Sequence, residues 1–199
     1  MAIRQQMRKK RSALPDYQQN IASSALTEKV LAHIPAIHHA DRIAFYLSQD
    51  GEIDLGPLIH HCYKQGRQCF LPVLDSSREY ELKFAEWTPE SSMSKNKYGI
   101  AEPVVPELQR LSASDMQFIF MPLVAFDADG QRLGMGGGYY DRSLASCSNS
   151  SDVAAKPLLV ATGHDFQFVH MLPHESWDIT PDITITPGRI IKSTARAET

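Results

Sequence analysis

The succession of apolar and helical patterns in residues 42–74 constrains the fold more than any other feature of the chain. The short apolar runs RIAFYLS at 42–48 and QCFLPVL at 68–74 predict two buried strands. The segment DLGPLIHHCYKQG at 54–66 lies between them, and its initial aspartate and terminal glycine favour the two ends of a helix. Because two strands joined by one crossover helix pair in parallel with a right-handed connection, we expect a parallel sheet.

Further segments extend this sheet. Residues 115–126, DMQFIFMPLVAF, form the most apolar run of the chain, which is typical of a central strand covered on both faces. Other patterns predict a polar loop at 91–106, helices at 16–34 and 139–146, and strands at 80–87, 157–163 and 182–187, the last of which we expect to end the sheet. The sum predicts an α/β fold, a three-layer, Rossmann-like open sheet that is mostly parallel and has helices on both faces. We expect residues 1–199 to form one domain.

The composition excludes several classes of protein. With 43% hydrophobic and 22% charged residues, the chain is neither disordered nor a coiled coil. No apolar run approaches the roughly 20 residues of a membrane span, and no apolar signal segment follows the basic N-terminus, so no membrane partner is expected. The three cysteines form no C-x-x-C pair, which argues against a disulfide framework or a zinc knuckle and favours a cytoplasmic protein.

Positive charge is concentrated at the N-terminus. Residues 1–11 hold five basic side chains and no acidic one, whereas the whole chain has a formal net charge of -3. A protein that coats nucleic acid spreads its positive charge over a face, so no nucleic-acid partner is expected. We expect residues 1–14 to form a basic helical arm, which suits a small anionic ligand such as a phosphate chain. A solvated helix face is the alternative interpretation.

A glycine-rich loop follows the most apolar strand. Four of the five positions from 134 to 138 are glycine, and the absence of side chains lets backbone N–H groups turn toward a ligand. A helix that begins near residue 139 would add its N-terminal dipole, and open α/β sheets bind ligands beyond the carboxyl ends of their strands. The loop therefore predicts an anion site, with a flexible turn of no chemical importance as the alternative.

The residues beside these glycines indicate that the anion is a phosphate. The loop is not a Walker A sequence, since no Lys-Ser or Lys-Thr follows it. It is not a dinucleotide fingerprint either, since Tyr139 stands where the third glycine would be. Arg132 and Arg142 suit phosphate oxygens, and the carboxylate of Asp141 could hold a magnesium ion. Asp141 could equally begin the helix.

Several segments of the chain resemble the 5-formyltetrahydrofolate cyclo-ligase family, whose members are also called 5,10-methenyltetrahydrofolate synthetases. The specific match is GQRLGMGGGYYDR at 130–142, which is similar to the signature of the family. Supporting matches are the basic N-terminus, YLSQDGEID at 46–54, FMPLVAFDADG at 120–130 and WDITPD at 177–182, which occur in the order of the family. Some relatives have a lysine among the loop glycines, and here Gly137 takes its place.

This resemblance implies an enzyme that converts 5-formyltetrahydrofolate and ATP to 5,10-methenyltetrahydrofolate, ADP and phosphate, with magnesium. The formyl oxygen would accept the γ-phosphoryl group, and attack by N10 would then close the ring and release phosphate. Such phosphoryl transfer needs positioning and charge compensation rather than a covalent nucleophile. The chain indeed has no G-x-S-x-G motif.

The resemblance also implies roles for individual residues. ATP contacts are expected from Arg4, Arg8, Arg132, Leu133, Gly134, Met135, Gly136, Gly137, Gly138, Tyr139 and Tyr140. Folate contacts are expected from Leu47, Glu52, Tyr98, Met135, Gly136, Gly137, Gly138 and Tyr139. Magnesium would be held by Asp141 and Asp178, and Arg142 would be catalytic because it neutralises charge on the transferring phosphoryl group.

Plainer interpretations exist for these residues when each is taken alone. Glu52 follows a D-G turn and could be solvated, Asp178 could be a turn carboxylate, and Tyr139 and Tyr140 could serve packing. Two other functions are also open. One is a Rossmann-like enzyme that binds a sugar phosphate in the loop, and the other is a regulatory module whose residues 1–11 bind nucleic acid. The leading hypothesis is a monomeric folate cyclo-ligase.

Overall fold

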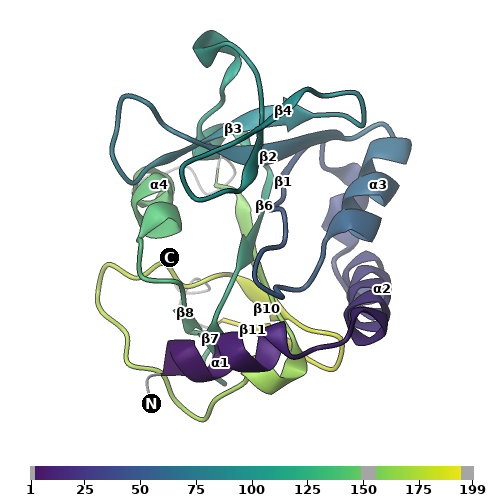
Figure 1. Ribbon diagram of the computed structural model, residues 1–199, viewed down its shortest axis with the longest axis vertical. Coiled ribbons are helices and arrows are strands. Elements are labelled where there is room, and N and C mark those ends of the chain that lie inside the picture. The colour runs from purple at the N-terminus through teal and green to yellow at the C-terminus, as the bar shows by residue number, and fades with distance from the viewer. Residues whose placement is uncertain (1–2, 149–155, 194–199) are drawn as a thin grey trace.

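A seven-stranded sheet forms the centre of the molecule within residues 3–148 and 156–193, which the computed structural model describes (Figure 1). Its strands, in spatial order, are β11 (Ile190–Lys192), β10 (Ile183–Ile185), β9 (Leu158–Thr162), β6 (Phe118–Pro122), β1 (Arg42–Ala44), β2 (Gln68–Leu74) and β3 (Leu82–Trp87). Neighbouring strands from β10 to β2 are parallel. Only the edge strands β3 and β11 pair antiparallel, so the prediction of a mostly parallel sheet is confirmed.

Helices cover both faces of this sheet. α2 (Asp16–His33) and α3 (Gly56–Lys64) lie on one side, and α4 (Tyr139–Ser148) lies on the other (Figure 1). Successive residues of a strand point to opposite faces. Ile43 and Phe120 therefore pack with α2 and α3, whereas Ala44 and Ile119 pack with α4. The three-layer α/β fold expected from the sequence is confirmed.

Short 3-10 helices connect several of these elements. They are η1 (Pro35–His39), η2 (Glu107–Gln109), η3 (Ala113–Asp115) and η5 (Asp165–Gln167). No helix in the described part of the chain is both long and apolar enough to cross a membrane.

The apolar run at 115–126 is divided between two sheets. β6 ends at Pro122, and β7 (Ala125–Phe126) then pairs antiparallel with β8 (Arg132–Leu133). Residues 123–126 remain apolar because they are buried outside the main sheet, in part against Met7 and Leu172. The glycine loop follows directly after β8.

Three sequence-based expectations need correction. The segment at 91–106 is not a plain loop, because β4 (Met93–Lys95) and β5 (Ala101–Pro103) form a hairpin in it. The strand at 182–187 is not the last, since β11 follows it. The strand expected at 42–48 is shorter, because only its first three residues belong to β1.

Helix α1 (Ile3–Ser12) crosses the end of the sheet near β7 and β8 (Figure 1). Its Met7 is buried against Val124 and Leu172. Its C-terminal end approaches Gly51 so closely that a Cβ at that glycine would lie 2.6 Å from the carbonyl carbon of Arg11. Gly51 also has a φ of +73°, so both its conformation and its contact with α1 require glycine.

The packing of α3 gives a direct test of the core. Leu58 is 0% exposed, whereas Leu108 is 99% exposed. We expect Leu58→Ala to lower the free energy of unfolding by about 2–5 kcal/mol, because the truncation leaves a cavity between α3 and the sheet. The matched substitution Leu108→Ala should change it by less than about 0.5 kcal/mol. Urea denaturation followed by circular dichroism measures both, and equal effects would contradict the assigned burial.

Candidate functional site

The order of the strands reverses between β1 and β6. The chain leaves β1 for β2 on one side and later returns to β6 on the other side of β1. Open α/β sheets bind ligands at such a point, beyond the carboxyl ends of the strands. Here these ends carry the loop 45–55 after β1 and the segment 123–138 after β6, which contains the glycine loop. The topology thus places the predicted anion site at the position where a ligand is expected.

The backbone of the glycine loop has conformations that favour glycine. Gly136 has a φ of +94° and Gly138 a φ of +67°. A Cβ at Gly138 would lie 2.7 Å from Nη1 of Arg142, so a side chain would displace this guanidinium. The loop ends at Tyr139, where α4 begins. The glycines therefore combine unusual dihedral angles with close approach of a cation.

Three guanidinium groups from different elements surround this loop. Arg4 of α1 donates from Nε to the Gly134 carbonyl at 2.8 Å, and Arg142 of α4 donates from Nη1 to the Gly137 carbonyl at 2.7 Å. A Cβ at Gly134 would lie 3.0 Å from Nη1 of Arg132, which is on β8. Three positive charges on one loop suit a polyanion such as a triphosphate.

Asp141 lies beside these cations and is already partnered. Its Oδ1 accepts a hydrogen bond from Arg132 at 2.7 Å and another from the backbone N–H of Ile179 at 3.2 Å. The second bond brings the segment that follows Asp178 against α4. The Asp178 carboxylate itself accepts the backbone N–H of Glu175 at 2.9 Å, which is a turn contact.

The described residues contain no group of three or more His, Cys, Asp or Glu side chains that could hold a metal ion. A protein site of one or two carboxylates still suits magnesium, which keeps several waters and shares phosphate oxygens. Both contacts of Asp141 use Oδ1, so its Oδ2 could bind an ion in a site of this type.

The side chain of Glu52, in the loop after β1, is largely buried. It is 12% exposed, and Oε1 lies 3.4 Å from Nη1 of Arg11. Oε2 accepts the backbone N–H of Gln49 at 3.1 Å. Burial raises the pKa of Glu52, although the positive charge of Arg11 opposes this effect. The interpretation of Glu52 as a solvated turn residue is therefore wrong.

The phenols of Tyr46 and Tyr140 lie close enough to Glu52 for its negative charge to shift their pKa. Burial raises the pKa of Tyr46 and of Tyr140, and the negative charge of Glu52 raises both further. The Tyr46 hydroxyl donates to the Ile53 carbonyl at 2.9 Å. Because Tyr140 follows the glycine loop directly, it connects the Glu52 region with the loop. Leu47, from the same segment as Glu52, is half-buried against the core on the α2–α3 face.

An aromatic cluster borders the loop on a third side. The hydroxyls of Tyr98 and Tyr139 are 2.8 Å apart, and their rings meet edge to face with centroids 6.0 Å apart. Tyr80 packs on Tyr139 with a centroid distance of 5.7 Å, and the Arg142 guanidinium lies 5.0 Å from the centre of the Tyr80 ring. A pocket of about 340 Å³ adjoins Tyr80, Tyr139 and Lys97. The cluster offers flat apolar surfaces beside the cations.

Some residues of this site were not expected from the sequence. Arg11 and Asp50 are the clearest examples, since Asp50 pairs with Arg8 at 2.6 Å and with Arg11 at 3.4 Å. Arg8, expected at ATP, thus lies at the loop after β1, whereas Arg4 lies at the glycine loop. The spacing of Arg4, Arg8 and Arg11 places all three on one helical face and could have drawn attention to Arg11.

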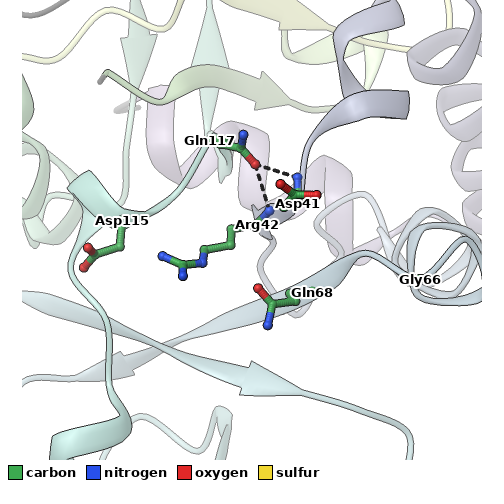
Figure 2. Close-up of a pocket in the computed structure, with 6 residues that line it drawn as sticks. All are labelled: Asp41, Arg42, Gly66, Gln68, Asp115 and Gln117. Atoms are coloured by element: carbon green, nitrogen blue, oxygen red, sulfur yellow. Dashed lines mark hydrogen bonds between the residues drawn. The ribbon is translucent and has the colours of Figure 1, made fainter. Parts of the chain in front are cut away.

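A second pocket, of about 500 Å³, lies at the opposite edge of the sheet (Figure 2). Its walls are Asp41, Arg42, Gly66, Gln68, Asp115 and Gln117. The side-chain carbonyl of Gln117 accepts the backbone N–H groups of Asp41 and Arg42, which joins the starts of two strands. Because these are the amino ends of β1, β2 and β6, the pocket is not the candidate site.

Comparison with known proteins agrees with the resemblance of the glycine loop. The chain is 38% identical to the 5-formyltetrahydrofolate cyclo-ligase of Escherichia coli (strain K12) over 92% of its own length and 98% of that protein. It is 38% identical to the enzyme of the same name from Haemophilus influenzae over 89% of its length and 91% of that protein. The NMR structure of Aquifex aeolicus 5,10-methenyltetrahydrofolate synthetase has a TM-score of 0.79 at 30% identity, over 96% of this chain and 91% of that one.

A family model covers nearly the whole chain as well. The model of the 5-formyltetrahydrofolate cyclo-ligase family matches residues 1–187, which include α1, the loop after β1, the glycine loop and Asp178. This match favours the folate enzyme over the sugar-phosphate enzyme and the nucleic-acid module. The chain belongs to the 5-formyltetrahydrofolate cyclo-ligase family.

Proposed function

We propose that this protein uses ATP and magnesium to cyclise 5-formyltetrahydrofolate to 5,10-methenyltetrahydrofolate, with release of ADP and phosphate. The observation that carries the proposal is the set of Arg4, Arg132 and Arg142 around the glycine loop, together with the largely buried Glu52 in the loop after β1. The cationic loop supplies a place for a triphosphate, and the enclosed carboxylate and aromatic rings supply one for a flat, hydrogen-bonding pterin.

The reaction has two steps. The formyl oxygen attacks the γ-phosphorus, so that an O–P bond forms and the bond to the β-phosphate oxygen breaks, which releases ADP. N10 then attacks the formyl carbon, N10 loses its proton, and the C–O bond breaks as phosphate leaves. Because both substrates must be held in line, the protein contributes mainly orientation and positive charge.

The cations around the loop perform the first step. Arg4 and Arg132 bind the phosphates, together with the backbone of residues 133–138 and the tyrosines at 139 and 140. Arg142 already contacts the loop through the Gly137 carbonyl, and we assign it the charge that develops on the transferring phosphoryl group. Arg8 would turn from Asp50 toward the nucleotide, since their contact is half-exposed.

Magnesium would be held by Asp141 and Asp178. Bound there, the ion supplies positive charge that neutralises phosphate oxygens. The hydrogen bond from Arg132 fixes the direction of the Asp141 carboxylate, and the bond from Ile179 brings the Asp178 segment to it. Asp141 is on α4 and Asp178 is in the 175–179 turn, so the metal site depends on the packing of this turn on α4.

The folate side uses the loop after β1 and the aromatic cluster. The carboxylate oxygens of Glu52 would accept hydrogen bonds from the N–H groups of the pterin, and Leu47 would supply apolar contact. Tyr98 and residues 135–139 of the loop would border the same ligand. We also propose that residues 1–199 act as one domain, as a monomer in the cytoplasm, without nucleic acid or membrane. Cys62, Cys69 and Cys147 are buried thiols, as a reducing compartment allows.

An absorbance assay tests the activity itself. Purified protein mixed with 5-formyltetrahydrofolate, ATP and magnesium should form methenyl product, and omission of any one of the three should stop it. Product formation without ATP, or none with all three present, would contradict the proposal.

Asp141→Asn tests the metal site. The substitution keeps the shape of the side chain but removes its charge, so kcat/KM should fall roughly 100-fold and more magnesium should be needed for half-maximal rate. The matched control is Asp129→Asn, which changes an exposed residue in the turn between β7 and β8 and should behave as wild type. A wild-type magnesium titration of Asp141→Asn would remove Asp141 from the site.

Glu52→Gln tests the folate contact through its pH dependence. Since burial raises the pKa of Glu52, wild-type kcat/KM for folate should decline as the pH falls through that raised pKa, because the carboxylate becomes neutral. The variant should have a KM for folate roughly tenfold higher or more, and it should lack this acid decline. The exposed Glu90→Gln should retain it. An unchanged acid decline in Glu52→Gln would assign the titration to another group.

A further inference from the structure

Arg11 occupies the centre of the contacts between α1 and the carboxyl edge of the sheet. Its side chain is 0% exposed. Nη1 lies 3.4 Å from Glu52 Oε1 and 3.4 Å from the Leu123 carbonyl, and Nη2 lies 3.4 Å from Asp50 Oδ2. Removing a guanidinium from water costs much free energy, and these three acceptors from the loops after β1 and β6 offset part of that cost, while the buried Nε has no hydrogen-bond partner. A cation held in this way is fixed in position.

One arm of the Arg11 guanidinium acts on Glu52. The other charged or titratable groups near that carboxylate are Asp50, which repels it, and the phenols of Tyr46 and Tyr140. Arg11 therefore supplies an attraction that favours the ionised form of this carboxyl and opposes the effect of burial, and its contact through Oε1 fixes the direction of the group. The Gln49 N–H, which donates to Oε2, fixes the second oxygen.

The other arm of the guanidinium anchors helix α1. It contacts Asp50, and the backbone of Arg11 lies directly against Gly51. Gly51 is itself held, because its carbonyl accepts hydrogen bonds from Gln19 and from the ring of His164. Arg4 lies two helical turns before Arg11 on the same helix and reaches the Gly134 carbonyl at 2.8 Å. The placement of Arg4 at the glycine loop thus depends on how α1 is anchored at its other end.

We propose that Arg11 is a positioning residue for both substrates. Through its contact with Glu52 it orients the carboxylate that binds folate, and through its contacts with Asp50 and Leu123 it holds α1 so that Arg4 stays at the ATP phosphates. Arg11 touches neither substrate. This inference rests on the proposed function, since it takes Glu52 as a folate contact and Arg4 as an ATP contact.

Steady-state kinetics of Arg11→Met test the inference. The substitution keeps an apolar stem of similar reach but removes the charge and both hydrogen-bonding arms. We expect KM for 5-formyltetrahydrofolate to rise about tenfold or more and KM for ATP to rise at least about threefold, because one ion contact and the anchorage of Arg4 are lost. The matched control is Lys10→Met, which removes a charge from the neighbouring, exposed position of α1 and should leave both constants unchanged.

Introducing Arg11→Met into the Glu52→Gln protein as well as into the wild type distinguishes a positioning role from a general loss of structure. In Glu52→Gln, Arg11→Met should raise KM for folate no further, because the group through which it acts has gone. It should still raise KM for ATP, since the anchorage of α1 is a separate contact. A structural defect would instead add its full effect to both constants in both backgrounds.

If Arg11→Met does not fold, the same KM values can be measured with Arg11→Lys. Lysine retains one charge but cannot reach Glu52 and Asp50 together, so at least one KM should remain raised. Wild-type turnover combined with unchanged KM values in a folded Arg11→Met or Arg11→Lys protein would overturn this inference alone. An undiminished folate effect in the Glu52→Gln background would overturn it too. Absence of methenyl product from the wild-type protein would overturn the proposed function and, with it, this inference.

Discussion

The parallel pairing of β1 with both β2 and β6 is the constraint on which the rest of the structure depends. Parallel strands end at the same edge of a sheet, so the loops that follow them are forced together even though they are far apart in the sequence. The order of strands reverses between β1 and β6, and open α/β sheets bind ligands at such a point. Helix α1 packs at this edge of the sheet through Met7 and Arg11, and it thereby joins the loop after β1 to the segment after β6.

Charge is distributed unevenly around this edge of the sheet. The chain as a whole has a formal net charge of -3, yet Arg4, Arg132 and Arg142 gather at the glycine loop. Arg11 is 0% exposed and its charge is balanced by Asp50 and Glu52, and Arg132 is likewise only 5% exposed and paired with Asp141. Arg4 and Arg142 are exposed, so an anionic ligand can reach them, whereas the buried Arg11 contacts groups of the protein. In the proposed function, Arg4 and Arg142 would serve ligand binding and Arg11 would serve positioning.

Local sequence patterns predicted the buried strands and helices well, but they predicted the exposed hairpin and the end of β6 poorly. The strand at 68–74 and the helix at 16–34 follow from apolar spacing, because burial selects side chains position by position. The β4–β5 hairpin was not predicted, because all three residues of β4 are exposed and carry no apolar pattern. The end of β6 was not predicted for the opposite reason, since residues 123–126 stay buried after the strand has ended.

The sequence by itself determined the type of the site. Glycines at four of five positions, with Arg132, Asp141 and Arg142 beside them, specify a loop that admits a backbone-bound anion, because backbone freedom and charge are properties of nearby residues. Only the tertiary structure decided that Glu52 is buried, that Arg8 reaches Asp50 and that Arg11 lies between two carboxylates. These contacts join α1 to a loop about forty residues away, and a sequence specifies the order of residues along the chain but not which distant segments the folded sheet brings together.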